Sequence, residues 1–321
     1  MRKKKLILVV VCLLQKFSYC QQEIAFTQFN FTNQLFNPSY VGTENQSNAF
    51  ILNRAQWIDI EGAPKSQAYG LNSYIENYNL GWGVELLNDQ IGPLEQITAS
   101  FDLSYHLKLN RKDHFLSLGL KISSTNFNFN NNELSIIDNG DTFFERSDYS
   151  QLQTNIGFGV LYRRPQFYIG LSIPFFLASD QFETVKHTYL SAGGEIELNN
   201  EWAIKPYNLF KYVKGAPLNY NLNLLLFFED IFWIGPSSSG ILINSGNASI
   251  QAPTSGLMVG LAINSYFSFG YSYTSITRID GKIFSNINSS THEFYLSYKF
   301  KSKSNRKEKK IGLKDKGTQI E

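Results

Sequence analysis

The stretch Leu116–Ile122, LSLGLKI, decides the fold because large apolar side chains occupy every second position, with small or polar ones between them. Side chains alternate between the two faces of a β-strand, so this stretch predicts a strand with one large apolar face and one small, polar face. The same pattern recurs at Leu80–Leu86, Asn155–Tyr162 and Phe267–Tyr273. Gly or Ser recurs on the small face, which indicates a curved wall around a crowded interior.

Two architectures bury such strands in different ways. In a soluble sandwich the large face meets a second sheet, whereas in a membrane barrel it faces lipid and the small face lines the interior. Glycine weakens the interior of a soluble strand, so its recurrence favours the barrel. No run after the N-terminal one approaches the length of a membrane helix, so any crossing is made by strands. We therefore predict an all-β, transmembrane, antiparallel up-and-down β-barrel of about 14 strands.

The candidate strands follow from this alternation and are separated by tight turns and longer polar loops in turn. The longest loops are predicted at 125–150, 240–254 and 275–290. Short turns at one end, long loops at the other and an even strand number are typical of bacterial outer-membrane barrels, whose closure leaves no unpaired edge in hydrocarbon. The predicted strands are 47–57, 66–76, 79–88, 95–107, 114–124, 151–162, 166–175, 187–198, 201–212, 219–228, 231–239, 255–263, 266–274 and 291–300.

The first twenty residues have the layout of a secretory signal peptide. Arg2–Lys5 is basic, Leu6–Leu14 is apolar, and Ser18 and Cys20 are small residues before a cut after Cys20. The apolar run is too short to span a bilayer as a helix. A lipid-modified Cys20 is the alternative, and the bulky Tyr19 directly before it argues against that modification.

Cysteine content and charge exclude several classes of protein. Cleavage would remove both cysteines, so the mature chain would hold no disulfide and no cysteine nucleophile. The formal net charge of the chain is +2, of which each end carries +5, leaving −8 for residues 21–300. This acidic body argues against nucleic-acid binding. The basic tail, 301–321, is predicted to be disordered and periplasmic, with docking to a periplasmic partner as the alternative.

Motifs for catalysis are not apparent in the sequence. None of its four histidines has a metal-ligand spacing such as HExxH, and the chain contains neither a GxSxG elbow nor a phosphate loop. A barrel phospholipase would need a nucleophile beside a histidine in space, which spacing along one sequence does not reveal. We therefore expect no enzymatic activity, no cofactor and no metal.

Several motifs follow one another in the N-terminal third of the chain. They are Phe26–Phe29, Phe36–Gly42 (FNPSYVG), Arg54–Trp57 (RAQW), Glu61–Lys65 (EGAPK) and Leu87–Pro93 (LNDQIGP). Their order and spacing resemble the PorP/SprF family of the type IX secretion and gliding machinery of Bacteroidetes. The resemblance is dense over residues 21–93 and is continued by the strand rhythm to Phe300, although Ser39 and Val41 stand where the family usually has alanines.

The resemblance implies a fourteen-stranded outer-membrane barrel that assists export, retention or surface anchoring of a secreted protein such as an adhesin. Its implied partners are that type IX client, periplasmic or outer-membrane secretion components, and lipid. A passive channel or transporter for small or hydrophobic solutes is the alternative, since about 14 strands also suit one by analogy of fold. The chain then divides into a signal peptide (1–20), an N-terminal segment (21–46), the barrel (47–300) and the tail.

The N-terminal motif reads as a turn that precedes the first strand. Asn37-Pro38 favours a turn because proline fixes φ and restricts the residue before it. Gly42, which follows Tyr40 in the motif, permits an unusual backbone dihedral. Residues 21–46 are predicted either to fold into the barrel as a plug or to form a periplasmic cap.

The first-strand motif predicts an anchor on the inner wall. Arg54 and Gln56 share one face, and a charged Arg54 facing lipid would cost about 2–4 kcal/mol, so this face should line the lumen. We expect Arg54 to tie the N-terminal segment to the wall. Trp57, on the opposite face, suits an interfacial aromatic girdle.

Two further motifs are predicted to lie in loops at the long-loop end. They are Gly62-Ala63-Pro64 in the first such loop, and Asp89 to Gly92-Pro93, after Asn88, in the second. Gly and Pro mark turns. These residues either hold the loops or shape a docking surface.

Overall fold

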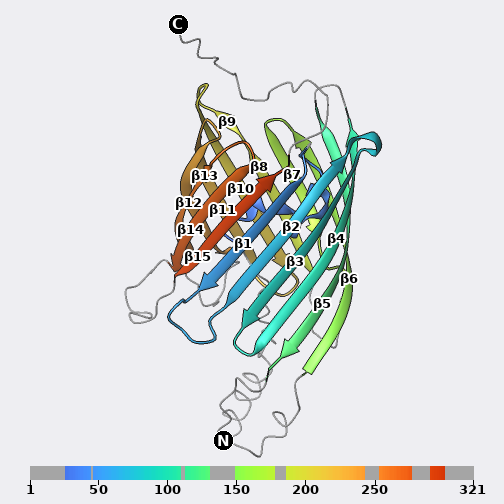
Figure 1. The fold of residues 1–321 in the computed structure, drawn as a ribbon, viewed down its shortest axis with the longest axis vertical. Helices are drawn as coiled ribbons and strands as arrows, with labels where there is room; N and C mark the ends of the chain where they lie inside the picture. Colours follow the sequence, from blue (N-terminus) through green and yellow to red (C-terminus); the bar gives the residue numbers. More distant parts are fainter. Residues whose placement is uncertain are drawn as a thin grey trace, which may run out of the picture.

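The computed structural model describes residues 26–44, 46–109, 113–130, 149–177, 186–242, 253–276 and 290–300 (Figure 1). The predicted signal peptide and basic tail lie outside these residues. Within them, fifteen strands form one sheet. The strands are β1 (Asn48–Gln56), β2 (Lys65–Ile75), β3 (Leu80–Ile91), β4 (Leu94–Lys108), β5 (Phe115–Phe129), β6 (Tyr149–Arg164), β7 (Phe167–Ile173), β8 (His187–Gly194), β9 (Ile196–Glu197), β10 (Trp202–Val213), β11 (Leu218–Phe228), β12 (Phe232–Leu242), β13 (Thr254–Ala262), β14 (Phe267–Ile276) and β15 (Thr291–Lys299).

The sheet closes into a barrel because its first and last strands pair. β1 and β15 run antiparallel from the pair Asn48–Lys299 to the pair Gln56–Thr291. β8 and β9 both pair with β10 and form a single stave that is interrupted at Glu195. The barrel therefore has fourteen antiparallel staves, which confirms the predicted fold class.

The two faces of the wall are reversed relative to a soluble protein. On β5, Leu118, Leu120 and Ile122 point outward and are 45%, 53% and 59% exposed, whereas Ser117 and Lys121, at alternate positions, are buried. The large apolar face thus surrounds the barrel, as the alternation predicts, and the small face lines a filled interior. No helix among the described residues is long and apolar enough to cross a membrane.

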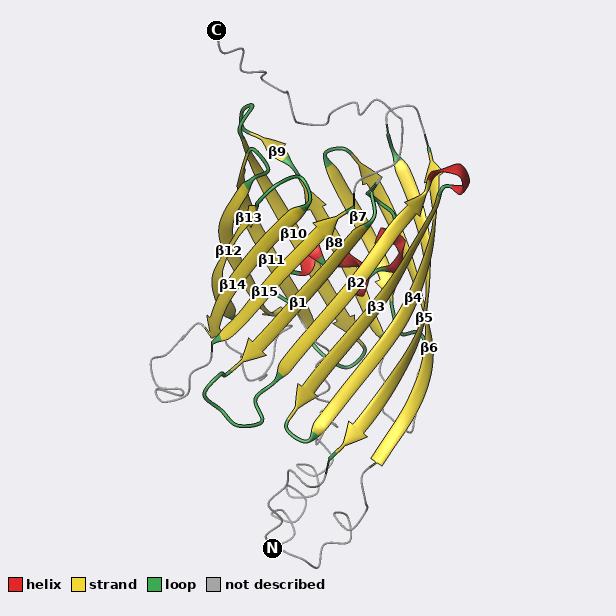
Figure 2. Ribbon diagram, in the orientation of Figure 1, coloured by secondary structure: helices red, strands yellow, loops and turns green. Residues whose placement is uncertain are grey.

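The connections differ between the two ends of the barrel (Figure 2). At one end they are short, for example residues 165–166 between β6 and β7 and residues 229–231 between β11 and β12. We call this the short-turn end. The other, the long-loop end, carries connections such as 57–64 and 277–290.

Strand lengths differ from the prediction in the middle of the chain. β5 continues five residues past its predicted end at residue 124, so the loop predicted for 125–150 begins later. β7 ends at Ile173 because Pro174 turns inward, and the Phe176 amide donates instead to the Ile156 carbonyl (2.7 Å). The stretch of β6 toward the long-loop end therefore extends beyond β7.

Candidate functional site

The N-terminal segment lies inside the barrel, where its short 3₁₀ helices η1 (Phe29–Phe31), η2 (Asn33–Leu35) and η3 (Pro38–Tyr40) are surrounded by strands (Figure 2). Phe26 and Phe29 are buried in a core with β-strand residues Phe50 and Leu52. This arrangement is the plug rather than the cap. The inner faces of the strands therefore form a binding site that is occupied by the N-terminal segment of the same chain.

The plug extends from near the long-loop end of β15 to the short-turn end of that strand. Its beginning contacts Glu293, the third residue of β15 from the long-loop end. Its end reaches the short-turn end, where the Glu44 carboxylate pairs with Lys299 Nζ (2.9 Å). We refer to residues 26–44 as the plug.

The first anchor of the plug is at the seam between β1 and β15. The buried carboxylate of Glu293 accepts hydrogen bonds from the backbone N–H groups of Thr27 (2.7 Å) and Gln28 (3.0 Å). Arg54 Nε lies 3.3 Å from the same carboxylate, and Arg54 and Glu293 are direct partners across the seam. The side-chain amide of Gln28 also donates to the backbone carbonyl of Glu293 (3.2 Å). A buried carboxylate needs such donors and a counter-charge.

Arg54 therefore faces the lumen, and its link to the plug passes through Glu293. The row continues from Arg54 to Ser66 on β2 and Asp89 on β3, which are register partners. Ser66 Oγ donates to the Asp89 carboxylate at 2.5 Å. Two motif residues, Arg54 and Asp89, are thus brought into one polar row. The loop position predicted for Asp89 is wrong, because β3 continues past Asn88 to Ile91 and keeps Asp89 in the wall.

The second anchor is a row of small residues that crosses five strands in register. We call it the small-residue track; it consists of Gly81, Ser104, Gly119, Gly159 and Ser172. Ser104 Oγ donates to the Val41 carbonyl (2.6 Å), and Ser172 Oγ donates to the Phe36 carbonyl (2.7 Å). The track therefore holds residues 36–41 by their backbone.

The glycines of the track leave no room for side chains. A Cβ atom on Gly119 would overlap the backbone of Pro38 and Ser39, and one on Gly159 would overlap the Asn37 amide. A Cβ on Gly81 would overlap the Val41 carbonyl. The glycine-rich inner face that the sequence predicts is therefore a surface whose shape is complementary to the plug.

The turn seated on the track is shaped by its own motif. Asn37 Oδ1 accepts from the Ser39 backbone N–H (3.0 Å) and caps η3, and Pro38 occupies the first helical position. Asn37 Nδ2 in turn donates to the Val160 carbonyl on β6 (3.4 Å). Gly42 has φ +74°, and a Cβ there would overlap Gly81. The turn prediction is confirmed, and Gly42 is needed for both its dihedral and its close approach.

Aromatic contacts complete the seating. Tyr40 meets Tyr168 edge-on, with ring centroids 5.4 Å apart. Phe31 stacks on Tyr295 of β15 (5.1 Å) and lies 5.2 Å from Trp233 of β12. Such pairs add to burial of apolar surface, so the plug contacts walls on opposite sides of the barrel.

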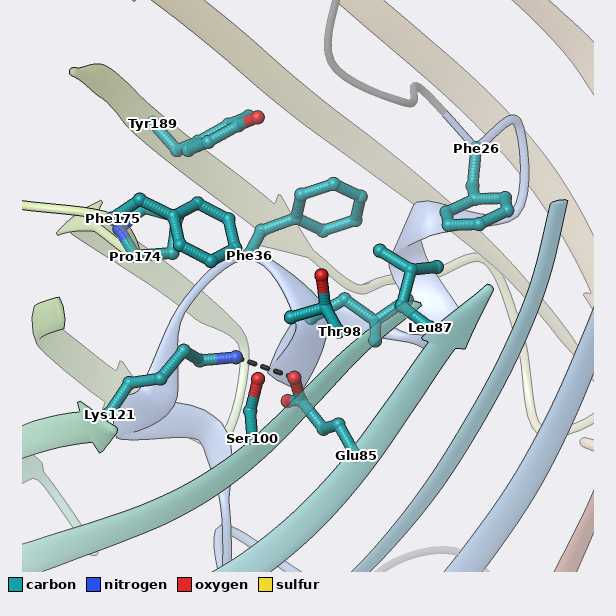
Figure 3. Close-up of a pocket in the computed structure, with 11 residues that line it drawn as sticks. Phe26, Phe36, Glu85, Leu87, Thr98, Ser100, Lys121, Pro174, Phe175 and Tyr189 are labelled. Atoms are coloured by element: carbon teal, nitrogen blue, oxygen red, sulfur yellow. Dashed lines mark hydrogen bonds and ion pairs between the residues drawn. The ribbon is translucent and has the colours of Figure 1, made fainter. Parts of the chain in front are cut away.

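A charged cluster lies beside the plug (Figure 3). Lys121 Nζ is 2.6 Å from Glu85 and 3.5 Å from Asp102, and it donates to the Gln34 carbonyl of the plug (3.4 Å). Buried charges persist when paired in this way. The adjoining space is lined mainly by apolar side chains, including Phe36 of the plug. Among the described residues, no group of three or more His, Cys, Asp or Glu side chains could hold a metal ion.

The remaining motif residues meet at the long-loop end. Trp57 follows β1 with φ +49°, and its N–H donates to the Ser290 carbonyl (2.9 Å). The Gln56 N–H donates to the Pro64 carbonyl (3.0 Å), and Ala63 is buried. These bonds fix the connection between β1 and β2.

That connection also touches the next hairpin. The Gly92 N–H donates to the Gly62 carbonyl (2.8 Å). Gly92 and Pro93 form a tight turn between β3 and β4 rather than part of a long loop. The two motifs that were predicted in separate loops are therefore locked together.

Sequence reasoning did not find Glu293 or the order of the small-residue track. The alternation of β15 places Tyr295, Ser297 and Lys299 on the inner face, and one more step back along that face reaches Glu293. For the track no signal along the sequence exists, because its order depends on the register of five strands.

Comparisons with known proteins agree with this geometry. A family profile described as "Type IX secretion system membrane protein PorP/SprF" matches residues 18–298. The CymD monoaromatic hydrocarbon channel is similar in structure, with TM-score 0.52, 12% identity, and coverage of 84% of this chain and 92% of that chain. The TodX deltaS2S3 mutant monoaromatic hydrocarbon channel has a TM-score of 0.50 and 9% identity, with coverage of 83% of this chain and 93% of that chain.

A Pseudomonas aeruginosa FadL homologue gives a TM-score of 0.47 at 11% identity, covering 82% of this chain and 92% of that chain. No curated protein sequence matches the chain. At these identities the likeness to CymD and the TodX mutant shows a shared barrel fold and nothing about a ligand.

Proposed function

We propose, from the premise that this chain belongs to the PorP/SprF family of type IX secretion membrane proteins, that its barrel is a closed outer-membrane platform that helps retain or anchor a secreted protein at the cell surface. The observation that carries the proposal is the occupied lumen. Residues 26–44 occupy it from Glu293 to Lys299 of β15 and are held at both anchors. A platform needs a rigid barrel with a closed lumen, whereas a solute channel needs an open path through the lumen.

The orientation follows from the connections. In outer-membrane barrels short turns face the periplasm and long loops face the exterior. The client would then meet the long-loop end, and secretion components would meet the short-turn end. A cleaved signal peptide ending at Cys20 would deliver the chain to the periplasm. We propose no catalytic role.

The test is deletion of the gene with complementation, read by protease shaving of intact cells. We expect one or a few surface proteins to be lost from the cells or released into the medium, and the wild-type gene to restore them. An unchanged surface proteome would sink the proposal.

The channel alternative makes an opposite electrical prediction. Purified mature protein in planar bilayers should show no stable conductance, because the plug fills the lumen. Steady single-channel currents, together with a normal surface proteome in the deletion strain, would favour the channel.

A further inference from the structure

The outward face of β1–β3 changes character toward the long-loop end. The register partners Ile51, Tyr69 and Leu86 are 44%, 38% and 43% exposed and belong to the lipid-facing belt. Two residues further along each strand, the partners Asn53, Gln67 and Asn88 form a polar row. This row marks where the wall leaves the hydrocarbon.

Apolar side chains reappear beyond this polar row. Trp57, Ile58 and Ile60 in the β1–β2 connection are 36%, 57% and 40% exposed. Ile91 and Leu94, at the tip of the β3–β4 hairpin, are 48% and 40% exposed. Trp57 lies six residues past Ile51, about 20 Å along an extended strand. We call residues 57–64 and 91–94 the outer tip.

The outer tip is a fixed surface rather than two separate loops. Its halves are joined by the bond from the Gly92 N–H to the Gly62 carbonyl (2.8 Å). The Ile60 N–H donates to the Trp57 carbonyl (2.9 Å), and Ala63 is buried beneath. Apolar groups that stay exposed together on a rigid surface typically mark an interaction site.

Charge around the outer tip indicates the chemistry of its partner. Asp59 and Glu61 are exposed within it, Glu95 adjoins it, and Lys65 is the single cation in residues 57–65 and 91–95. We propose that the outer tip docks a secreted client protein through a segment that presents apolar side chains flanked by Lys or Arg. This inference rests on the proposed function and names its contact surface.

Photo-crosslinking in living cells tests the docking directly. A photoreactive residue at Ile58 is compared with one at Ile263, which is 66% exposed at the opposite, short-turn end. We expect an adduct with a secreted protein at position 58 and not at 263, degraded by protease added outside the cells. The crosslinked peptide should carry Lys or Arg beside apolar residues.

A charge reversal gives the decisive control. The double substitution Asp59→Lys and Glu61→Lys should lower the adduct yield about tenfold, because like charges across an interface oppose association. Asn128→Lys, on the outward face of β5 beyond the polar row, should leave the yield unchanged. Heat-modifiable migration of each variant verifies that the barrel is folded.

Several outcomes would overturn the proposal. They are adducts with lipid alone at position 58, which would place Trp57 and its neighbours in the membrane interface, equal adducts at both positions, no adduct, or a yield that survives charge reversal. If the deletion strain loses its surface protein while these outcomes hold, the docking surface is wrong and the proposed function stands. If the deletion strain is unaffected, both fail.

Discussion

The two anchors of the plug hold it by different physics. At the seam, one buried carboxylate gathers two backbone N–H groups and a guanidinium, so Glu293 concentrates the interaction in a single group. On the small-residue track, the plug backbone lies against positions that lack side chains, and the interaction is spread over five strands. Binding of the plug at the seam therefore depends on charge pairing, and its binding on the track depends on the space that the missing side chains leave for the plug backbone.

This difference teaches where each anchor is fragile. An isosteric change that removes charge should break the seam and leave the track intact. A single added methyl group should break the track and leave the seam intact. Variants of the two kinds can separate the anchors, with thermal unfolding in detergent and protease cleavage of residues 26–44 as common measurements.

The largest effect is expected for Glu293→Gln. It leaves the buried Arg54 guanidinium without its carboxylate and should lower the free energy of unfolding by about 4 kcal/mol. Cleavage within residues 26–44 should accelerate. The matched control is Glu44→Gln, whose pair with Lys299 is half-exposed and should be worth about 1 kcal/mol or less. Equal effects of the two variants would contradict the seam anchor.

A smaller loss is expected for Gly119→Ala on the track. The new methyl group overlaps plug backbone, which cannot move aside as a side chain can, so we expect about 3 kcal/mol. Gly240→Ala is the control, because the atoms nearest to its Cβ would belong to the Tyr220 side chain, which can shift, and not to backbone. If Gly119→Ala were as stable and as protease-resistant as Gly240→Ala, the small-residue track would not be the surface that holds the plug.

Arg54→Ala should cost less than Glu293→Gln. The Glu293 carboxylate keeps its two backbone donors, so the expected loss is about 2 kcal/mol, the range for a hydrogen bond to a charged group. The order of the two midpoints in thermal unfolding is the measurement. An Arg54→Ala barrel with unchanged unfolding and unchanged protection of the plug would remove Arg54 from the anchor.

The smallest expected effect is that of Asn37→Ala, which removes the cap of η3 while leaving the track itself intact. Loss of such a cap costs about 1 kcal/mol. Asn53→Ala, on the outward polar row, serves as a control with an expected change near zero. A loss from Asn37→Ala larger than that from Gly119→Ala would reverse the order of the two contributions.

Much of the fold is predictable from the sequence because the period of two is a local property. The alternation at Leu116–Ile122 predicts which side chains face the lumen and which face outward. Its recurrence along the chain predicts the fourteen strands. The prediction ends β5 too early because its outward residues past Ile122, such as Asn126 and Asn128, are polar where the wall rises beyond the lipid. It runs β7 too far because Pro174 turns inward to pack near Gly157, a contact that no local pattern encodes.

The site is less predictable because it depends on register. Arg54 is expected to face the lumen on the energetic cost of the alternative, and it does. Its partner Glu293 lies 239 positions away in the chain, across the seam that closure creates. The glycines are individually visible, but only strand pairing aligns Gly81, Gly119 and Gly159 into one bed.

Amide hydrogen exchange of the mature barrel in detergent tests the central claim most directly. The account predicts strong protection of the Thr27, Gln28 and Ser39 amides, which donate to buried acceptors, at levels comparable with the strand amides of β15. Exchange of these plug amides as fast as that of Glu61 in the exposed connection would show that the lumen is not held closed by the plug.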